Sequence, residues 1–92
     1  MEKLSADQVR SAIATMPGWN LEGAEIAKQY TFDNFMGSVG FVNRLAEVAE
    51  AANHHPDLAI NWNKVRVSLS THSANAITER DVEVAKKIDA VA

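Results

Sequence analysis

Apolar and polar residues recur with a helical period in some segments of this chain and alternate in others. Apolar residues three or four positions apart predict a helix, whereas alternation predicts a strand with one buried face. Ser5–Gln8 and Thr78–Asp81 have the pattern of capping boxes, and Asp33 can cap another helix. The predicted elements are a helix over 6–15, strands over 19–22 and 25–32, a helix over 34–52, strands over 58–62 and 64–72, and a helix over 79–90.

This α-β-β-α-β-β-α order places strand hairpins between helices. Such segregation favours an α+β fold with helices on one face of an antiparallel sheet. The chain has 92 residues, so we expect one domain over residues 1–92. A domain this short buries a modest share of its surface, and association with further copies would bury more.

The helix predicted over 34–52 has two apolar stripes, which is more than one side of a small sheet requires. One stripe therefore faces the sheet, and we expect the other to face a partner subunit, with Phe41 pointing outward. A deeply seated helix in a monomer is the alternative. The first stripe is Phe35, Val39, Val42, Ala46 and Ala49, and the second is Phe41, Leu45, Val48 and Ala52.

Composition narrows the possible functions. The net charge is −3 and no basic cluster is present, which argues against binding to nucleic acid or to an anionic membrane. The chain contains no cysteine, which excludes thiolate nucleophiles and disulfides. It has neither a signal-peptide pattern nor an apolar run long enough to span a membrane. We therefore expect a cytoplasmic protein.

The candidate chemistry comes from three histidines, His54, His55 and His72. A hairpin turn near Asn63 folds the two following strands together, which should bring His72 towards the adjacent pair. Imidazole both gives and takes protons near neutrality, because its unperturbed pKa is about 6.5. A cluster of imidazoles without a nucleophile or a cofactor loop points to elimination, hydration or isomerisation.

Simpler roles are open for each histidine. His54 and His55 precede Pro56 at the end of a predicted helix, where histidine complements the helix dipole and proline ends the helix. His72 can be a strand-end residue with an ordinary hydrogen bond. A zinc site is a further alternative, since three histidines can hold zinc. We expect no metal, because neither an H-x-H nor an H-x-x-x-H spacing is present.

With these histidines in view, the sequence resembles the pterin-4a-carbinolamine dehydratase family, also known as the dimerisation cofactor of a homeodomain transcription factor. The resemblance runs from Trp19 almost to the C-terminus. Each matching segment is weak evidence for the family when it is taken alone. Together, in this order and at this spacing, the segments are specific for it. The segments are Gly18-Trp19, Phe32, Gly40-Phe41, His54-His55-Pro56, Asn63-Lys64-Val65, Leu69-Ser70-Thr71-His72 and Glu79-Arg80-Asp81.

The resemblance implies a four-stranded antiparallel sheet with three helices on one side. It also implies a cofactor-free enzyme that forms homodimers or homotetramers through the helix over 34–52 and the sheet edges. The family's catalytic histidines correspond to His54, His55 and His72. Residues expected near the pterin are Pro56, Thr71, Ser73, Ala74, Trp19, Glu50, Asn53 and Asp81, although Asp81 also fits a capping role and Trp19 and Glu50 also fit structural ones.

Three positions differ from the pattern of some members. Asn53 replaces an aspartate before the paired histidines, where a carboxylate would make a neighbouring imidazole more basic and an amide only orients it. Ser73 replaces a glutamate, and Ala76 replaces a frequent glycine. These differences concern the rate and the stereochemical preference more than the class of reaction.

The expected reaction is dehydration of 4a-hydroxytetrahydrobiopterin, or of its bacterial counterpart, to a quinonoid dihydropterin. An aromatic amino acid hydroxylase would supply that substrate and is a possible partner. One histidine would protonate the leaving hydroxyl while another accepts a ring proton. His54 and His72 are expected to share these roles in an order that the sequence leaves open, with His55 and Thr71 positioning the ring. A non-catalytic protein-interaction module is the rival function.

Overall fold

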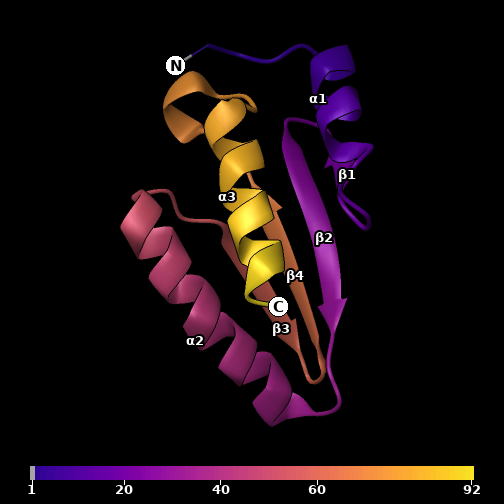
Figure 1. Ribbon diagram of the computed structural model, residues 1–92, viewed down its shortest axis with the longest axis vertical. Coiled ribbons are helices and arrows are strands. Elements are labelled where there is room, and N and C mark those ends of the chain that lie inside the picture. The colour runs from indigo at the N-terminus through magenta and orange to yellow at the C-terminus, as the bar shows by residue number, and fades with distance from the viewer. Residues whose placement is uncertain (1) are drawn as a thin grey trace.

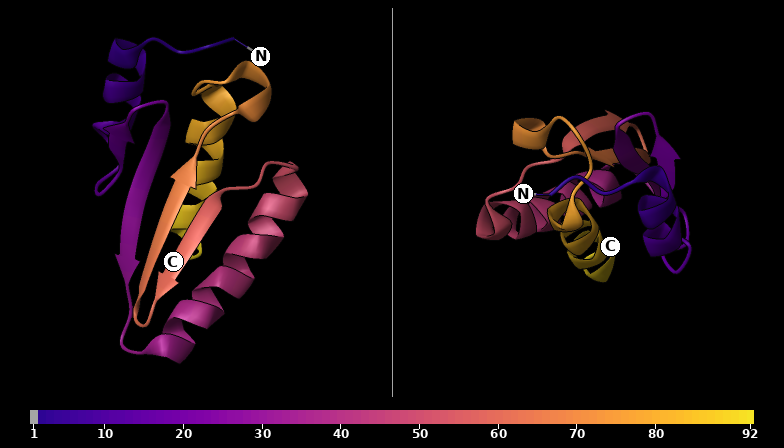
Figure 2. Two further views of the ribbon diagram at one scale, coloured as in Figure 1. Left: turned by 180° about the vertical axis from the view of Figure 1, so that it is seen from behind. Right: turned by 90° about the horizontal axis from the view of Figure 1, so that it is seen from above.

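The computed structural model describes residues 2–92 and confirms the predicted α+β order. Within these residues, three helices lie on one side of a four-stranded antiparallel sheet of order β1-β2-β4-β3 (Figures 1 and 2). The elements are α1 (Ala6–Ile13), β1 (Asn20–Glu22), β2 (Glu25–Thr31), α2 (Phe35–Ala52), β3 (Asp57–Asn61), β4 (Lys64–Leu69), the 3₁₀ helix η1 (His72–Ala74) and α3 (Glu79–Ala90).

Strand β4 lies between β2 and β3 and carries the centre of the core. Its alternate residues Val65, Val67 and Leu69 are buried beneath the helices. They pack in one cluster with residues such as Leu45 of α2 and Ile88 of α3. The predicted alternation of this strand is therefore confirmed, and it fixes which face of the hairpin the helices cover.

Helix α2 buries Phe41, Leu45 and Ala49 on one line, together with Ser38. The expectation that Phe41 points outward is wrong, because this side chain is fully buried. Phe41 packs against the rings of Tyr30 and Phe32, so it belongs to the core. The large apolar side chains of α2 that are exposed are instead those of Phe35 and Met36, both in its first turn.

The start of α2 also differs from the prediction. Asn34 rather than Asp33 caps the helix: its backbone is extended, and its side-chain oxygen accepts a hydrogen bond from the Gly37 amide at 2.8 Å. Aspartate and asparagine are both good N-cap residues, so the sequence alone does not show which of these two neighbours caps the helix. The capping boxes at Ser5–Gln8 and Thr78–Asp81 are confirmed, although α1 ends at Ile13 rather than at residue 15.

The strand that was predicted to reach His72 ends at Leu69. Beyond it, Thr71 pairs with Ala76 across a tight loop, through hydrogen bonds of 2.8 and 3.3 Å between their backbone groups. This pairing removes the chain from the sheet, so His72 opens η1 instead of ending a strand. No helix of the described residues is both long and apolar enough to cross a membrane.

Candidate active site

The C-terminus of α2 turns sharply at Asn53. Asn53 has a left-handed backbone (φ 50°), which asparagine tolerates better than most residues. Its amide bonds to the Glu50 carbonyl and the His54 amide to the Ala49 carbonyl, both at 3.1 Å. This is the pairing of a Schellman motif, in which a left-handed residue reverses the chain after a helix. The reversal places His54 inside the protein, where it is only 8% exposed.

The buried ring of His54 meets a carboxylate from α3. Its Nε2 atom lies 2.5 Å from Oδ1 of Asp81, and Asp81 is completely buried. A carboxyl group gives up its proton more readily than an imidazolium does, which favours Nε2–H as the donor and Asp81 as the acceptor. A buried carboxylate that holds one ring nitrogen in this way fixes the ring's orientation and its tautomer.

The second oxygen of Asp81 accepts two further hydrogen bonds. The Thr71 hydroxyl donates to Oδ2 at 2.8 Å and the Thr78 amide at 2.9 Å. The hydroxyls of Thr71 and Thr78 lie 2.8 Å apart. Because the single hydroxyl proton of Thr71 is directed at Asp81, the Thr78 hydroxyl is the donor between them. One carboxylate thus joins the end of α2, the segment after β4 and the first turn of α3.

This geometry bears on the expectation that Thr71 positions the substrate ring. Thr71 is buried and its hydroxyl proton is committed to Asp81. Its side chain therefore acts on Asp81.

His55 lies outside this buried network. Its Nε2 atom is 2.7 Å from Oε1 of Glu50, one turn earlier on α2. The two side chains are 55% and 78% exposed, so the pair is in contact with solvent. Pro56 follows, half-buried, and leads directly into β3. The pair is available to a ligand at the surface and contributes little to stability there.

His72, Ser73 and Ala74 form η1 immediately after Thr71. His72 and Ser73 are exposed and Ala74 is half-buried. Because the Thr71 hydroxyl bonds to Asp81 and Asp81 bonds to His54, η1 starts beside the His54 network. Hollows of about 250, 380 and 220 Å³ occur elsewhere on the described surface, and no histidine lines them.

Trp19 lies in another part of the fold. Its Nε1 atom donates to Oδ2 of Asp89 at 3.1 Å, and Asp89 is eight residues beyond Asp81 on α3. Eight helical residues span about 12 Å, so Trp19 belongs to the opposite end of this helix. The structure brings together His54, Asp81 and Thr71, with Asn53, His55 and Glu50 adjacent to them, but it does not bring Trp19 to this group.

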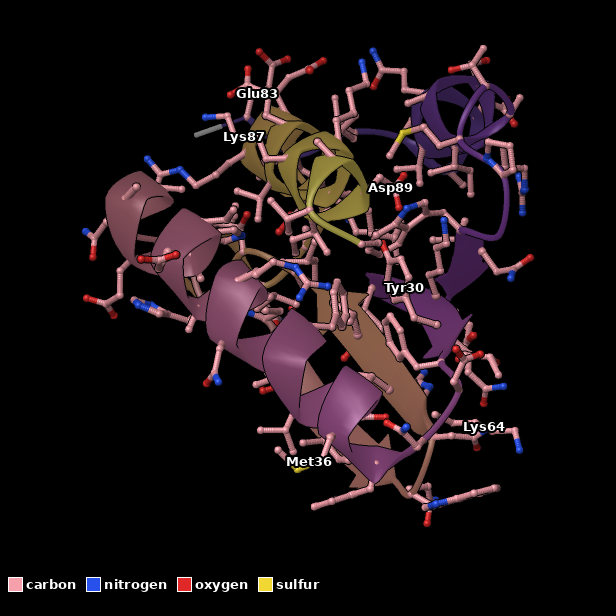
Figure 3. All side chains as sticks on the ribbon, turned by 60° about the horizontal axis from the view of Figure 1, so that its bottom comes forward. Tyr30, Met36, Lys64, Glu83, Lys87 and Asp89 are labelled. Atoms are coloured by element: carbon pink, nitrogen blue, oxygen red, sulfur yellow. The ribbon has the colours of Figure 1, made fainter. Side chains whose placement is uncertain are left out.

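Asp89 forms a second polar cluster that the sequence did not reveal. Its Oδ1 atom accepts hydrogen bonds from Lys28, at 2.9 Å, and from the hydroxyl of Tyr30 (Figure 3). Burial, together with the hydrogen bond to Asp89 and the charge of that carboxylate, raises the pKa of the Tyr30 hydroxyl far above its ordinary value. The cluster ties the last turn of α3 to β2.

Thr78 is the residue of the histidine network that sequence reasoning missed. Its capping-box pattern was visible, but that pattern predicts only contacts three residues apart. In the part of the chain that the structure describes, no group of three or more histidine or acidic side chains is arranged to hold a metal ion.

The fold and this site define a class of protein: an α+β domain with a histidine held by a buried carboxylate and further imidazoles at the surface. Imidazole groups in such surroundings can give and take protons. A family model for pterin 4 alpha carbinolamine dehydratase matches residues 2–91. The chain belongs to this family of dehydratases.

Relatives and solved structures agree with that assignment. A protein of Thermosynechococcus vestitus is 45% identical over 91 residues, which cover 99% of this chain and 96% of the relative. One of Sulfurisphaera tokodaii is 46% identical over 89 residues, or 97% and 96% of the two chains. Both have the provisional name pterin-4-alpha-carbinolamine dehydratase.

Among solved structures, a transcriptional coactivator/pterin dehydratase of Brucella melitensis matches with a TM-score of 0.93 and 33% identity over 99% of both chains. A pterin dehydratase-like RuBisCO assembly factor of the alpha-carboxysome matches with a TM-score of 0.71. That protein is 20% identical, with 83% of this chain and 90% of the other covered, and it shares the fold.

Proposed function

We propose that this protein dehydrates 4a-hydroxytetrahydrobiopterin, or the bacterial counterpart of that pterin, and so returns the tetrahydropterin cofactor of an aromatic amino acid hydroxylase to its cycle. In this reaction the C4a–O bond breaks, a ring nitrogen loses its proton, and the hydroxyl leaves as water. The product is the quinonoid dihydropterin. The observation that carries the proposal is the bond of His54 to buried Asp81, beside the exposed His55 and η1.

The hydrogen bonding of Asp81 favours His54 as the base. With Nε2–H donating to Asp81, the ring nitrogen of His54 that remains for a ligand is Nδ1. In a neutral imidazole that atom has a lone pair and can accept the proton of the pterin nitrogen. The imidazolium that forms is then stabilised by the adjacent carboxylate, as in a serine protease triad.

His72 is then the acid of the proposal. It is exposed on η1, next to Thr71, and an imidazolium at this position can protonate the departing hydroxyl. Each proton-transfer group of this kind contributes about 10²–10⁴-fold to the rate. His55, paired with Glu50 at the surface, would position the ring.

A stopped-flow assay with freshly generated 4a-hydroxytetrahydropterin tests these roles. His54→Ala and His72→Ala should each slow dehydration by about 10²–10⁴-fold. His72→Ala should leave the unfolding midpoint unchanged, since His72 is exposed. Arg10→Ala is a matched control at an exposed position on α1 and should retain the full rate. Full activity of both histidine variants would refute the proposal.

Protein interaction is the second candidate function. The exposed apolar side chains of Phe35 and Met36 favour it, as does the Brucella melitensis match, whose name includes a transcriptional coactivator. These residues lie at the opposite end of α2 from His54. Met36→Glu should therefore abolish binding to such a partner and preserve dehydration. Loss of both activities in that variant would argue against two separable functions.

A further inference from the structure

A hollow of about 250 Å³ opens between α1, the turn after β1 and the segment that follows η1. Leu4, Val9, Leu21, Ala76 and Ile77 give it an apolar lining. Val9, Ala76 and Ile77 are buried, whereas Leu4 and Leu21 are half-buried. Figure 1 shows α1 and the chain after β4 at the same end of the molecule. The lining of the hollow therefore continues into the core.

Two polar side chains line the same hollow, and neither has a partner among the described residues. Lys3 is exposed, and no carboxylate of residues 2–92 lies within ion-pair distance of its ammonium group. Asn75 is exposed too, and its side-chain amide makes no hydrogen bond to residues 2–92. A cation and an amide beside an apolar lining suit a ligand that has an apolar body and one negative charge. A carboxylate supplies that charge and accepts hydrogen bonds from both groups.

The volume of the hollow limits the apolar body of such a ligand. Clefts that hold drug-sized ligands measure about 300–1,000 Å³, so a hollow of about 250 Å³ suits a smaller molecule. A single aromatic ring on a short chain can fill this space and bury most of its surface. The charge and the volume together therefore favour a small aromatic monocarboxylate.

One wall of the hollow belongs to the loop that carries His72. The Asn75 amide donates to the His72 carbonyl at 3.1 Å. Ala76 exchanges backbone hydrogen bonds of 2.8 and 3.3 Å with Thr71, the residue immediately before His72. The hollow therefore lies against the returning half of a short loop, and the outgoing half of the same loop starts at the His54 network.

We propose that this hollow binds a small aromatic monocarboxylate, which acts as an effector of the histidine site. The ring would pack on the apolar lining, and the carboxylate would accept from Lys3 and Asn75. A molecule lodged against Asn75 and Ala76 restrains the loop and keeps His72 in place for a pterin. This inference rests on the proposed function, because it takes His72 as part of the site. By linkage, the effector and the pterin then strengthen each other's binding by the same factor.

Calorimetry with 3-phenylpropionate tests the binding site. A ligand of this size should bind with a Kd on the order of 1 mM. Lys3→Gln should weaken binding about 3- to 5-fold, which is the range of an exposed ion pair. Ala6→Leu fills the hollow from an exposed position on α1, where leucine is a good helix former, and should abolish binding. Lys86→Gln, at an exposed position on α3 away from the hollow, is the matched control and should bind as the wild type does.

An uncharged analogue tests the chemical class of the ligand. 3-Phenylpropan-1-ol keeps the ring and lacks the negative charge, so the wild type and Lys3→Gln should bind it equally. If Lys3→Gln weakens the alcohol and the carboxylate by the same factor, Lys3 does not recognise charge and the assignment of a carboxylate is wrong. Unchanged binding of 3-phenylpropionate to Ala6→Leu would place the ligand elsewhere and overturn the site.

Hydrogen exchange measures whether the ligand holds the loop. The amides of Thr71 and Ala76 bond across the loop, so both exchange when the loop opens. At ten times the Kd of 3-phenylpropionate, an opening that releases the ligand becomes about 10-fold rarer, and exchange of both amides should slow by that factor. The amide of Asn53, which bonds to the Glu50 carbonyl at the end of α2, lies outside the loop and should keep its rate. Unchanged exchange of Thr71 and Ala76 would reject the effector role.

A titration with 7,8-dihydrobiopterin connects the hollow to the histidine site without catalysis. Saturating 3-phenylpropionate should tighten the binding of this pterin about 5-fold in the wild type and have no effect in Ala6→Leu. Binding of 3-phenylpropionate with no effect on the pterin would also reject the effector role. If His54→Ala and His72→Ala kept the full dehydration rate while exchange and both titrations gave the expected results, the catalytic proposal would fail and the effector site would stand.

Discussion

His54 and Asp81 lie 2.5 Å apart, although 26 residues separate them in the chain. The contact joins the residue after the C-terminal turn of α2 to the first turn of α3. Asp81 also receives hydrogen bonds from Thr71 and Thr78, so it holds the histidine in a fixed place. The carboxylate therefore determines which nitrogen of His54 is available to a ligand.

Asp81→Asn should change which ring nitrogen of His54 is free to accept a proton, and it should preserve the fold. The amide oxygen can still accept from Thr71 and from the Thr78 amide, so the amino group must face His54. The amino group is a donor, and it would make Nε2 of His54 an acceptor and move the ring proton to Nδ1. A ring with its proton on Nδ1 cannot act as the base there, so kcat should fall by about 10²–10⁴-fold in the stopped-flow assay.

Stability provides the check on this variant. Since the helix cap survives, the free energy of unfolding in urea should fall by no more than about 2 kcal/mol. Asp89→Asn is the matched control, a carboxylate at the other end of the same helix. It should lose similar stability and keep its kcat. Equal losses of kcat in the two variants would mean that Asp81 acts only through the position of α3.

Glu50→Gln should have little effect on stability. The carboxylate of Glu50 and the ring of His55 are both mostly exposed, and pairs of this kind contribute about 0–1 kcal/mol. Chemical denaturation should therefore show a change below about 1 kcal/mol. If His55 positions the pterin, the KM of Glu50→Gln should rise while its unfolding midpoint stays constant. A large loss of stability with an unchanged KM would assign the pair a structural role.

Local contacts of the site were predictable and distant ones were not. The bond of Asp81 to the Thr78 amide spans three residues, and the capping-box pattern predicted it. The bond of the same carboxylate to His54 depends on how α2 and α3 pack, which no local pattern encodes. Asn53 shows the same division. The chemistry of its side chain, an amide in place of a carboxylate, can be read from the sequence, but its left-handed backbone, which directs His54 inward, depends on the folded chain.

The fold order was predictable because periodicity reports which residues share a face. Periodicity does not show which of the two stripes of α2 faces the core, because both stripes are apolar and both follow helical spacing. Only packing against Tyr30 and Phe32 places Phe41 in the core. The cluster around Asp89 was hidden for a similar reason, because Trp19, Lys28 and Tyr30 reach it across about 60 to 70 positions of sequence.

Asn53 offers a test of how the backbone sets the site. Asn53→Gly should retain stability, because glycine adopts the left-handed conformation without strain. Asn53→Ala should lose about 1 kcal/mol, since a Cβ atom is unfavourable there and the helix cannot end as well. If the turn is what presents His54, Asn53→Gly should also keep the full dehydration rate. Thermal unfolding and the stopped-flow assay measure the two effects, and equal stability of the two variants would contradict this account.

Tyr30 provides a prediction on pH. It is the only tyrosine of the chain, so the phenolate absorbance reports it alone. Burial first, then the hydrogen bond to Asp89 and the charge of that carboxylate, raise the pKa of its hydroxyl in the folded protein. The unfolded chain should ionise near pH 10 and the folded protein should not. Absorbance should therefore show no phenolate in the folded protein at pH 11, and full titration in guanidinium.

The sign of the effect on stability follows from proton binding. Below about pH 10 both states keep the tyrosine proton, so the contribution of this group is fully present. Above that pH the unfolded state loses the proton first, and the free energy of unfolding falls by about 1.4 kcal/mol per pH unit. In Tyr30→Phe this loss disappears, so the advantage of the wild-type protein over the variant should shrink from pH 10 upward. Parallel stability curves for the two proteins between pH 9 and pH 11.5 would show that Tyr30 is not held neutral by its surroundings.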